Sequence, residues 1–107
     1  MKIAIATFGS RVSPRLDCAP AFLVVTFADN RPVKREELVA TGWATHERMG
    51  HLLKLGIDAV ICGGIDWLSA ETLCSQGVAL YAGVTGEIED AVTAFVRGEL
   101  NSHSYHA

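Results

Sequence analysis

Hydrophobic positions in the chain recur with two periods, one typical of strands and the other of helices. Three segments in the first forty residues have the pattern of strands, and the first two are almost wholly apolar. Asp29 and Asn30 separate the second from the third and predict a hairpin turn. The third is charged, which suits a sheet edge where charge discourages pairing with another chain. These predicted strands are Lys2–Thr7, Phe22–Ala28 and Pro32–Ala40.

The rest of the chain alternates between helices with one apolar stripe and short apolar strands. Thr45 and Asp66 are suitable N-caps for the first and second helices. The third helix has apolar residues at i, i+3, i+4, i+7 and i+8 from Ile88, with acidic residues in its first turn. The predicted helices are Thr45–Leu55, Trp67–Gln76 and Glu87–Arg97, and the predicted strands are Ala59–Ile61 and Val78–Ala82.

This order of elements, βββαβαβα, predicts an α/β fold with a five-stranded mixed sheet and helices on both faces. The first three strands can form an antiparallel meander, and the later alternation requires right-handed parallel crossovers. If the first strand lies beside Ala59–Ile61, their connections leave in opposite directions and create a crevice that suits a ligand. The long connection from Phe8 to Pro20, which lacks a pattern of its own, would lie there, as would residues 62–64 and 83–86.

Composition narrows the class of protein. The chain has 107 residues, half of them hydrophobic, which predicts one globular domain over residues 1–100 and a flexible polar tail over 101–107. A formal net charge of −3 argues against a nucleic-acid-binding protein, and no apolar run is long enough to span a membrane. The odd number of cysteines, with no closely spaced pair, indicates reduced thiols and a cytoplasmic protein.

Four stretches, which together extend over most of the chain, resemble the dinitrogenase iron–molybdenum cofactor biosynthesis family of NifX-like and NafY-like proteins. They are residues 1–7, the Val-Ser-Pro and Ala-Pro-Ala-Phe segments within residues 12–22, the segment Gly-Ile-Asp-Ala-Val-Ile-Cys-Gly-Gly-Ile at 56–65, and residues 77–100. The resemblance implies a ribonuclease-H-like fold and a small non-catalytic carrier of a molybdenum- or iron-containing sulfide cluster. Some members, the orange proteins, hold a mixed molybdenum–copper cluster.

The chain departs from this family within the long connection between Phe8 and Pro20. Members often read Ser-x-His-Phe-Gly before a basic residue and Ala-Pro. Here the corresponding positions hold Arg15, Leu16, Asp17 and Cys18, so arginine replaces the histidine and a thiol appears.

Two thiols are candidate metal ligands. Cys62 ends a strand before two glycines, and a thiolate there would suit copper or iron, although a buried cysteine can equally be a small core residue. Cys18 lies on the long loop and has less reason to be core. Cys74, within a helix, is assigned to the core.

Seven further residues are candidates for holding an anionic cluster. Arg11 and Arg15 can supply positive charge and N–H donors, with Ser13 beside them, or can be solvated loop charges. His46 in a first helical turn is either a ligand or a plain surface residue. Main-chain amides before the helices provide the rest. The full set is Arg11, Ser13, Arg15, His46, Gly63, Gly64 and Thr85.

Three functions compete on these observations. The first is a cluster carrier that is a monomer or weak dimer, binds donor and acceptor proteins, and binds neither nucleic acid nor membranes. The second, a nuclease, needs several carboxylates on a hard metal, for which Asp17, Asp58 and Asp66 are available, but the first strand carries no acid. The third is a regulatory or partner-binding domain of the same fold with no cofactor.

Overall fold

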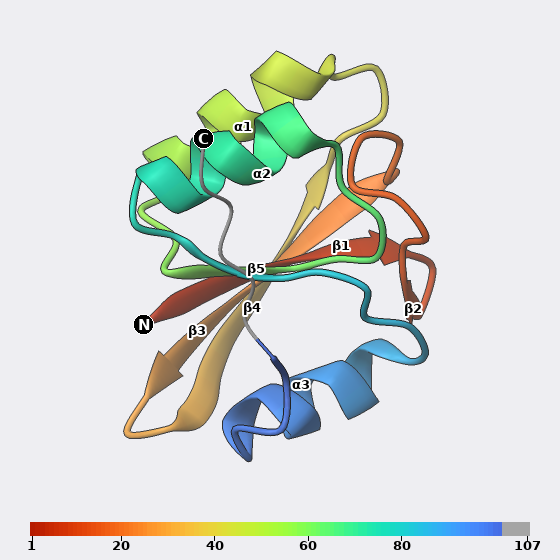
Figure 1. Ribbon diagram of the computed structural model, residues 1–107. Coiled ribbons are helices and arrows are strands. Elements are labelled where there is room, and N and C mark those ends of the chain that lie inside the picture. Colours follow the sequence, from red (N-terminus) through yellow and green to blue (C-terminus); the bar gives the residue numbers. More distant parts are fainter. Residues whose placement is uncertain (102–107) are drawn as a thin grey trace.

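The computed structural model describes residues 1–101, and a six-stranded mixed sheet forms its centre. Helices α1 and α2 cover one face of the sheet and α3 covers the other (Figure 1). The strands are β1 Lys2–Phe8, β2 Arg11–Val12, β3 Ala21–Ala28, β4 Arg31–Val39, β5 Ala59–Ile61 and β6 Ala79–Tyr81. The helices are α1 Thr45–Lys54, α2 Trp67–Ser75 and α3 Ile88–Val96. The predicted α/β fold is confirmed.

The strands lie in the order β4-β3-β1-β5-β6, with β2 paired to β1 outside this path. β1, β3 and β4 form the predicted antiparallel meander, and β1, β5 and β6 run parallel. Asp29 and Asn30 both have positive φ, 53° and 63°, as a two-residue type I′ hairpin requires. The predicted neighbourhood of β1 and β5 is confirmed, and it places the crevice at their carboxyl ends.

Alternation along β1 divides the core into two layers. Ala4 and Ala6 belong to the cluster under α1 and α2, whereas Ile3 and Ile5 belong to the cluster under α3. Small residues on one side of the strand and large ones on the other set how closely each helix layer packs. All four side chains are fully buried, so β1 has the cover on both faces that a central strand needs.

Two details of the prediction were wrong. The sheet has six strands rather than five, because the Phe8–Pro20 connection is not structureless and contains β2. Thr45 does not cap α1; the N-cap is Ala44, whose N–H donates to Glu47 Oε1 at 3.0 Å. The cap predicted for α2 is confirmed, since Asp66 Oδ2 accepts from the Ser69 N–H at 2.9 Å.

None of the helices in residues 1–101 has the length and apolar character needed to cross a membrane. The tail predicted over 101–107 lies, after its first residue, outside the described residues.

Candidate functional site

Main-chain hydrogen bonds join the crevice loop, residues 13–18, to the end of β5. The Gly64 N–H donates to Pro14 O at 2.6 Å, and the Leu16 N–H donates to Gly64 O at 2.8 Å. The Ser13 N–H donates to Ala6 O at 2.8 Å, which ties the start of the loop to β1. Two segments some fifty residues apart in sequence therefore form one edge, as the proposed crevice requires.

The two glycines after β5 are needed for this contact. A Cβ atom at Gly63 would lie 2.6 Å from the main-chain oxygens of both Ser13 and Pro14. At Gly64 it would lie 3.3 Å from Pro14 O. Sequence reasoning expected the glycines to open the strand end to a ligand, whereas the atoms that approach them here belong to the loop.

Arg48 on α1 holds the other end of the loop, and sequence reasoning missed it. This buried guanidinium donates to Ala19 O at 2.6 Å and to Leu16 O at 3.3 Å, both through Nη1. Its other nitrogens donate to Trp43 O at 3.1 Å and Ala40 O at 3.2 Å. An arginine directly beside Met49 in the helix's apolar stripe was the signal that could have revealed it.

Charged side chains of the loop pair with each other at the surface. Arg15 Nε donates to Asp17 Oδ1 at 2.9 Å, and Nη2 donates to Oδ2 at 3.3 Å. This pairing raises the pKa of Arg15, with smaller contributions from Cys18 and Asp66, and lowers the pKa of Asp17. Cys18 is an exposed free thiol. The loop thus presents an arginine and a thiol within electrostatic reach of each other.

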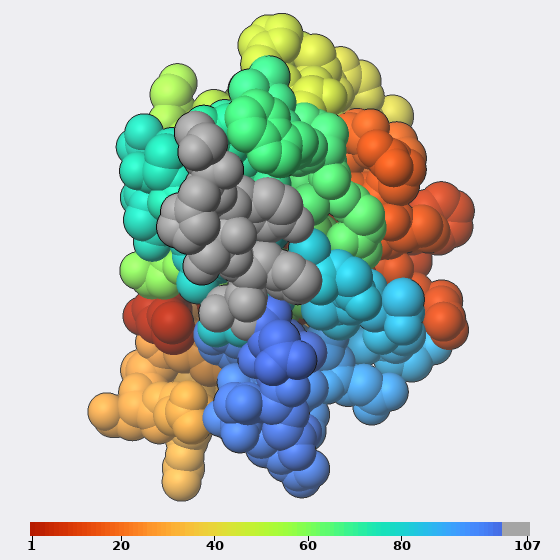
Figure 2. Space-filling view, viewed as in Figure 1, coloured from red at the N-terminus to blue at the C-terminus, as the bar shows by residue number. Residues whose placement is uncertain are grey.

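A groove of about 690 Å³ lies between α1 and α2 beside this loop. Figure 2 shows the three segments, the loop in orange, the start of α1 in yellow and the start of α2 in green, meeting on one side of the molecule. The walls of the groove combine apolar side chains with polar ones. The groove is lined by Asp17, Thr45, His46, Met49, Gly50, Leu53, Asp66, Leu68, Ser69 and Thr72.

Three polar side chains give this groove its chemistry. His46 is exposed in the first turn of α1, as predicted from its position, and Asp17 and Asp66 come from the loop and the start of α2. Asp66 uses one oxygen as the helix cap, while its other oxygen, Oδ1, is buried with no hydrogen-bond partner among the described residues. These three side chains therefore line the groove together with apolar residues of both helices.

Cys62 lies beneath this edge rather than on it. Its side chain is 0% exposed and belongs to the core cluster under α1 and α2. Burial raises the pKa of this thiol to about 12, so the thiol form is strongly favoured at neutral pH. These observations support the core reading of Cys62 that the sequence left open.

The remaining predicted residues are not all at the groove. Ser13 is buried and donates from Oγ to Arg15 O at 2.9 Å, so it shapes the loop. Arg11 pairs with Glu87 at the start of α3, with 3.2 Å between Nη1 and Oε1. Thr85 lines a separate hollow of about 370 Å³ that also includes Gly83 and Leu100. The loop and the groove bring the other predicted site residues into one region: Arg15, Cys18, His46, Gly63 and Gly64.

The acids considered for a nuclease do not converge. Asp17 and Asp66 line the same groove, but Asp58 precedes β5 and its carboxylate accepts from the Lys2 N–H at 2.9 Å at the opposite end of β1. Within residues 1–101, no three His, Cys, Asp or Glu side chains are grouped closely enough to hold a metal ion together.

Solved structures confirm the fold. A candidate dinitrogenase from Methanocaldococcus jannaschii superposes with a TM-score of 0.84 at 21% identity, covering 99% of this chain and 97% of that one. The apo form of the orange protein from Desulfovibrio gigas gives a TM-score of 0.83 at 21% identity, with 97% and 93% covered. PH0822 gives 0.85 at 23% identity, with 96% of both chains covered. No curated protein sequence matches significantly.

The sequence profile of the dinitrogenase iron–molybdenum cofactor family matches residues 1–98. The match spans every helix and strand described above, together with the crevice loop and the groove. The chain therefore belongs to this family, which the resemblance of its strand and loop sequences predicted.

Proposed function

We propose that the protein binds and carries a molybdenum- or iron-containing sulfide cluster, without turnover, and passes it between a donor and an acceptor protein. The observation that carries the proposal is the loop edge, where Arg15 and Cys18 stand exposed beside the groove. An anionic thiometallate needs positive charge, N–H donors and soft sulfur ligands, and this edge offers all three.

The chain's own residues would share the work as follows. Cys18 provides a thiolate to a soft metal such as copper or iron, and Arg15 provides charge and N–H donors to the cluster's sulfides. His46, at the loop end of the groove, is a further donor. Gly63, Gly64 and Ser13 hold the loop in place, as their contacts with it indicate. A site with few protein ligands suits cargo that must be released.

Anaerobic reconstitution tests this proposal. The protein is incubated with tetrathiomolybdate, with and without Cu(I), desalted and analysed for molybdenum per chain and for visible absorbance. We expect stoichiometric molybdenum in the wild type and at least about a tenfold weaker retention in Cys18→Ser, because a thiolate ligand is lost. Cys62→Ala is the matched control and retains the cluster, since that thiol is buried.

A wild type that retains no cluster under any of these conditions would overturn the proposal. Equal loss in Cys18→Ser and Cys62→Ala, with both variants folded, would show that the exposed thiol has no special part in binding.

A second function, a partner-binding domain with no cofactor, is favoured by two observations. Asp17 already neutralises Arg15, and the start of α2 exposes Trp67 and Leu68 to 56% and 67% beside the groove. Exposed apolar side chains next to a groove are typical of protein interaction sites. A stable complex with a purified partner protein that contains no molybdenum, iron or copper, and needs none to form, would favour this function.

A further inference from the structure

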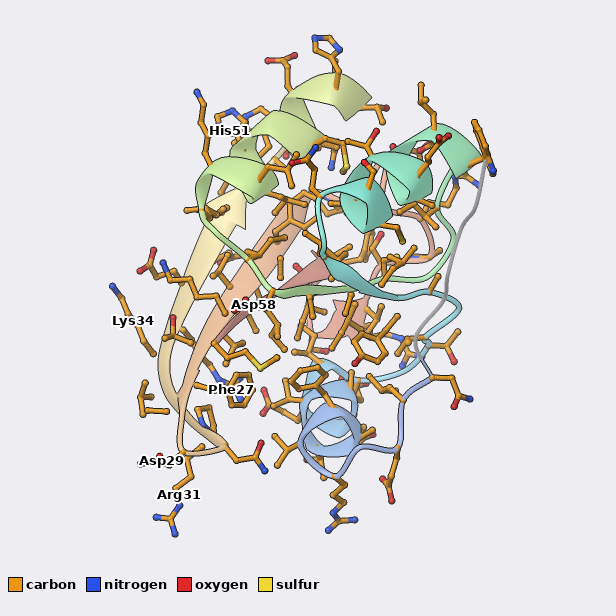
Figure 3. The ribbon with its side chains drawn as sticks, turned by 60° about the vertical axis from the view of Figure 1, so that its left-hand side comes forward. Phe27, Asp29, Arg31, Lys34, His51 and Asp58 are labelled. Atoms are coloured by element: carbon orange, nitrogen blue, oxygen red, sulfur yellow. The ribbon has the colours of Figure 1, made fainter. Side chains whose placement is uncertain are left out.

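No strand among residues 1–101 pairs with the outer edge of β4. Residues 31–37 are all exposed, and the strand lies at the outer side of the sheet, with the side chains of Arg31 and Lys34 pointing away from the body of the molecule (Figure 3). Two apolar residues near the ends of the strand, Val33 and Val39, are 62% and 68% exposed. Charge along such an edge opposes most pairings, but it can leave one register open.

Alternation of the main chain defines which residues offer hydrogen bonds outward. The Ala40 N–H donates to Pro20 O at 2.9 Å, so the main chain of Ala40 faces β3. Because main-chain groups alternate sides along a strand, Leu38 and Glu36 also face β3. Arg35, Glu37 and Val39 consequently present their N–H and C=O groups to the outside.

Symmetry restricts how a second copy can pair with this edge. Two antiparallel copies of one strand are related by a two-fold axis perpendicular to the sheet, which keeps α1 and α2 on the same face in both. In an antiparallel pair, residues directly opposite each other have their side chains on the same face of the sheet. Because this two-fold axis also keeps each side chain on its face, it must pass beside one residue, which then lies opposite the same residue of the other copy, and not between two neighbouring residues. An axis at Arg35 or Glu37 would place like charges opposite each other in a hydrogen-bonded pair.

An axis level with Glu36 gives a complementary register. Arg35 of each copy lies opposite Glu37 of the other, in the pairs whose main-chain groups face outward. Val39 of each copy comes beside the part of the other copy's β4 that contains Val33, where the pairing of β4 with β3 shifts register, so the two exposed apolar residues adjoin. Both matches occur twice, once on each side of the axis.

The one like-charge contact in this register is already compensated. Glu36 of one copy lies opposite Glu36 of the other across the axis. Each Glu36, however, is paired with Lys34 of its own chain at 2.6 Å. Lys34 lowers the pKa of this carboxyl, and the four side chains together are neutral. Arg35 also keeps its bond to Glu89 on α3, at 2.6 and 2.9 Å, because a guanidinium has five N–H donors and this pairing uses two.

We propose that β4 pairs with β4 of a second copy of this chain, antiparallel and centred on Glu36, to form a reversible dimer with one continuous sheet. The inference does not depend on whether the crevice binds a cluster. In this arrangement the loop edges of the two copies lie outside the interface, because β4 is separated from β5 in each sheet by β3 and β1.

A charge-exchange experiment tests the register. Wild type and variants are followed by sedimentation velocity up to about 1 mM, the range in which weak pairing is detected. We expect wild-type dimer, at least about tenfold weaker dimerisation in Glu37→Lys and in Arg35→Glu, and recovery when these two variants are mixed, because the mixed pair restores both opposite charges. Glu99→Lys, which makes the same charge change at another exposed position, dimerises like the wild type.

Hydrogen exchange supplies a second readout. In the wild-type dimer the amide protons of Arg35 and Glu37 exchange more slowly as concentration rises, while that of Glu36 is protected at every concentration. A wild type that is monomeric throughout this range would overturn the proposal. So would a dimer that Glu37→Lys and Glu99→Lys weaken equally, or one that mixing the two opposed variants does not recover.

Discussion

At the scale of single residues, close main-chain contacts determine what the site tolerates. The two glycines after β5 illustrate this best, since their lack of side chains lets the loop approach the strand end. A Val-Ile-Cys-Gly-Gly segment predicts a strand and its end, but the pattern does not say which group approaches the glycines. That information lies in a contact with residues about fifty positions earlier, which no local pattern contains.

Gly63→Ala is therefore expected to destabilise the fold by about 1–3 kcal/mol, because the new Cβ would overlap two carbonyl oxygens that the loop cannot easily move. Gly50→Ala is the matched control. Gly50 lies in α1 with nothing within 4 Å of a Cβ, and alanine there is expected to stabilise by up to about 1 kcal/mol. Chemical denaturation of the two variants checks both signs, and a neutral Gly63→Ala would contradict the packing described here.

At the scale of elements, the sequence predicted the helices and the principal strands well. The two periods of hydrophobic residues are local, and the αβαβα half of the chain follows them to within one or two residues. β2 was missed because two residues, Arg11 and Val12, carry no periodic signal. The groove was missed as well, because it depends on how α1 and α2 pack against the loop, although its member His46 was selected.

Arg48 joins two connections to α1, so we expect its loss to affect more than the helix. Arg48→Met removes the four hydrogen bonds that the guanidinium donates to carbonyls of the loop and of the β4–α1 connection, and it should lower the free energy of unfolding by about 3 kcal/mol or more. Arg97→Met, at the exposed end of α3, should change it by less than about 0.5 kcal/mol.

Amide exchange distinguishes the cause of this loss. If Arg48 anchors the loop, the Arg48→Met substitution accelerates exchange of the Leu16 amide more than it accelerates exchange of the β1 amides. A uniform acceleration throughout the protein would instead indicate a general loss of core packing.

At the scale of the whole molecule, the charge of the chain and the charge of the site act differently on an anionic ligand. The chain carries a formal net charge of −3, so a dianion such as tetrathiomolybdate is repelled at long range. Salt screens charges farther than about 8–10 Å at physiological ionic strength, which leaves the local balance of Arg15 and Asp17 to decide binding.

Asp17→Asn should thus tighten tetrathiomolybdate binding by about tenfold, because it removes one local negative charge and frees the Arg15 guanidinium. Asp90→Asn on the exposed surface of α3 also changes the net charge from −3 to −2 but lies on the other face of the sheet. Anaerobic spectrophotometric titration at 150 mM salt compares them, and equal tightening would mean that only the net charge matters.

The crevice loop is fastened through backbone atoms and through Arg48, which lies outside it. Its outward side chains, among them Arg15, Asp17 and Cys18, make none of the bonds that join it to β1, β5 and α1. Shape and chemistry are thereby uncoupled at this edge. Substitutions at these three positions can therefore change the groups that the edge offers to a ligand while the scaffold beneath stays the same.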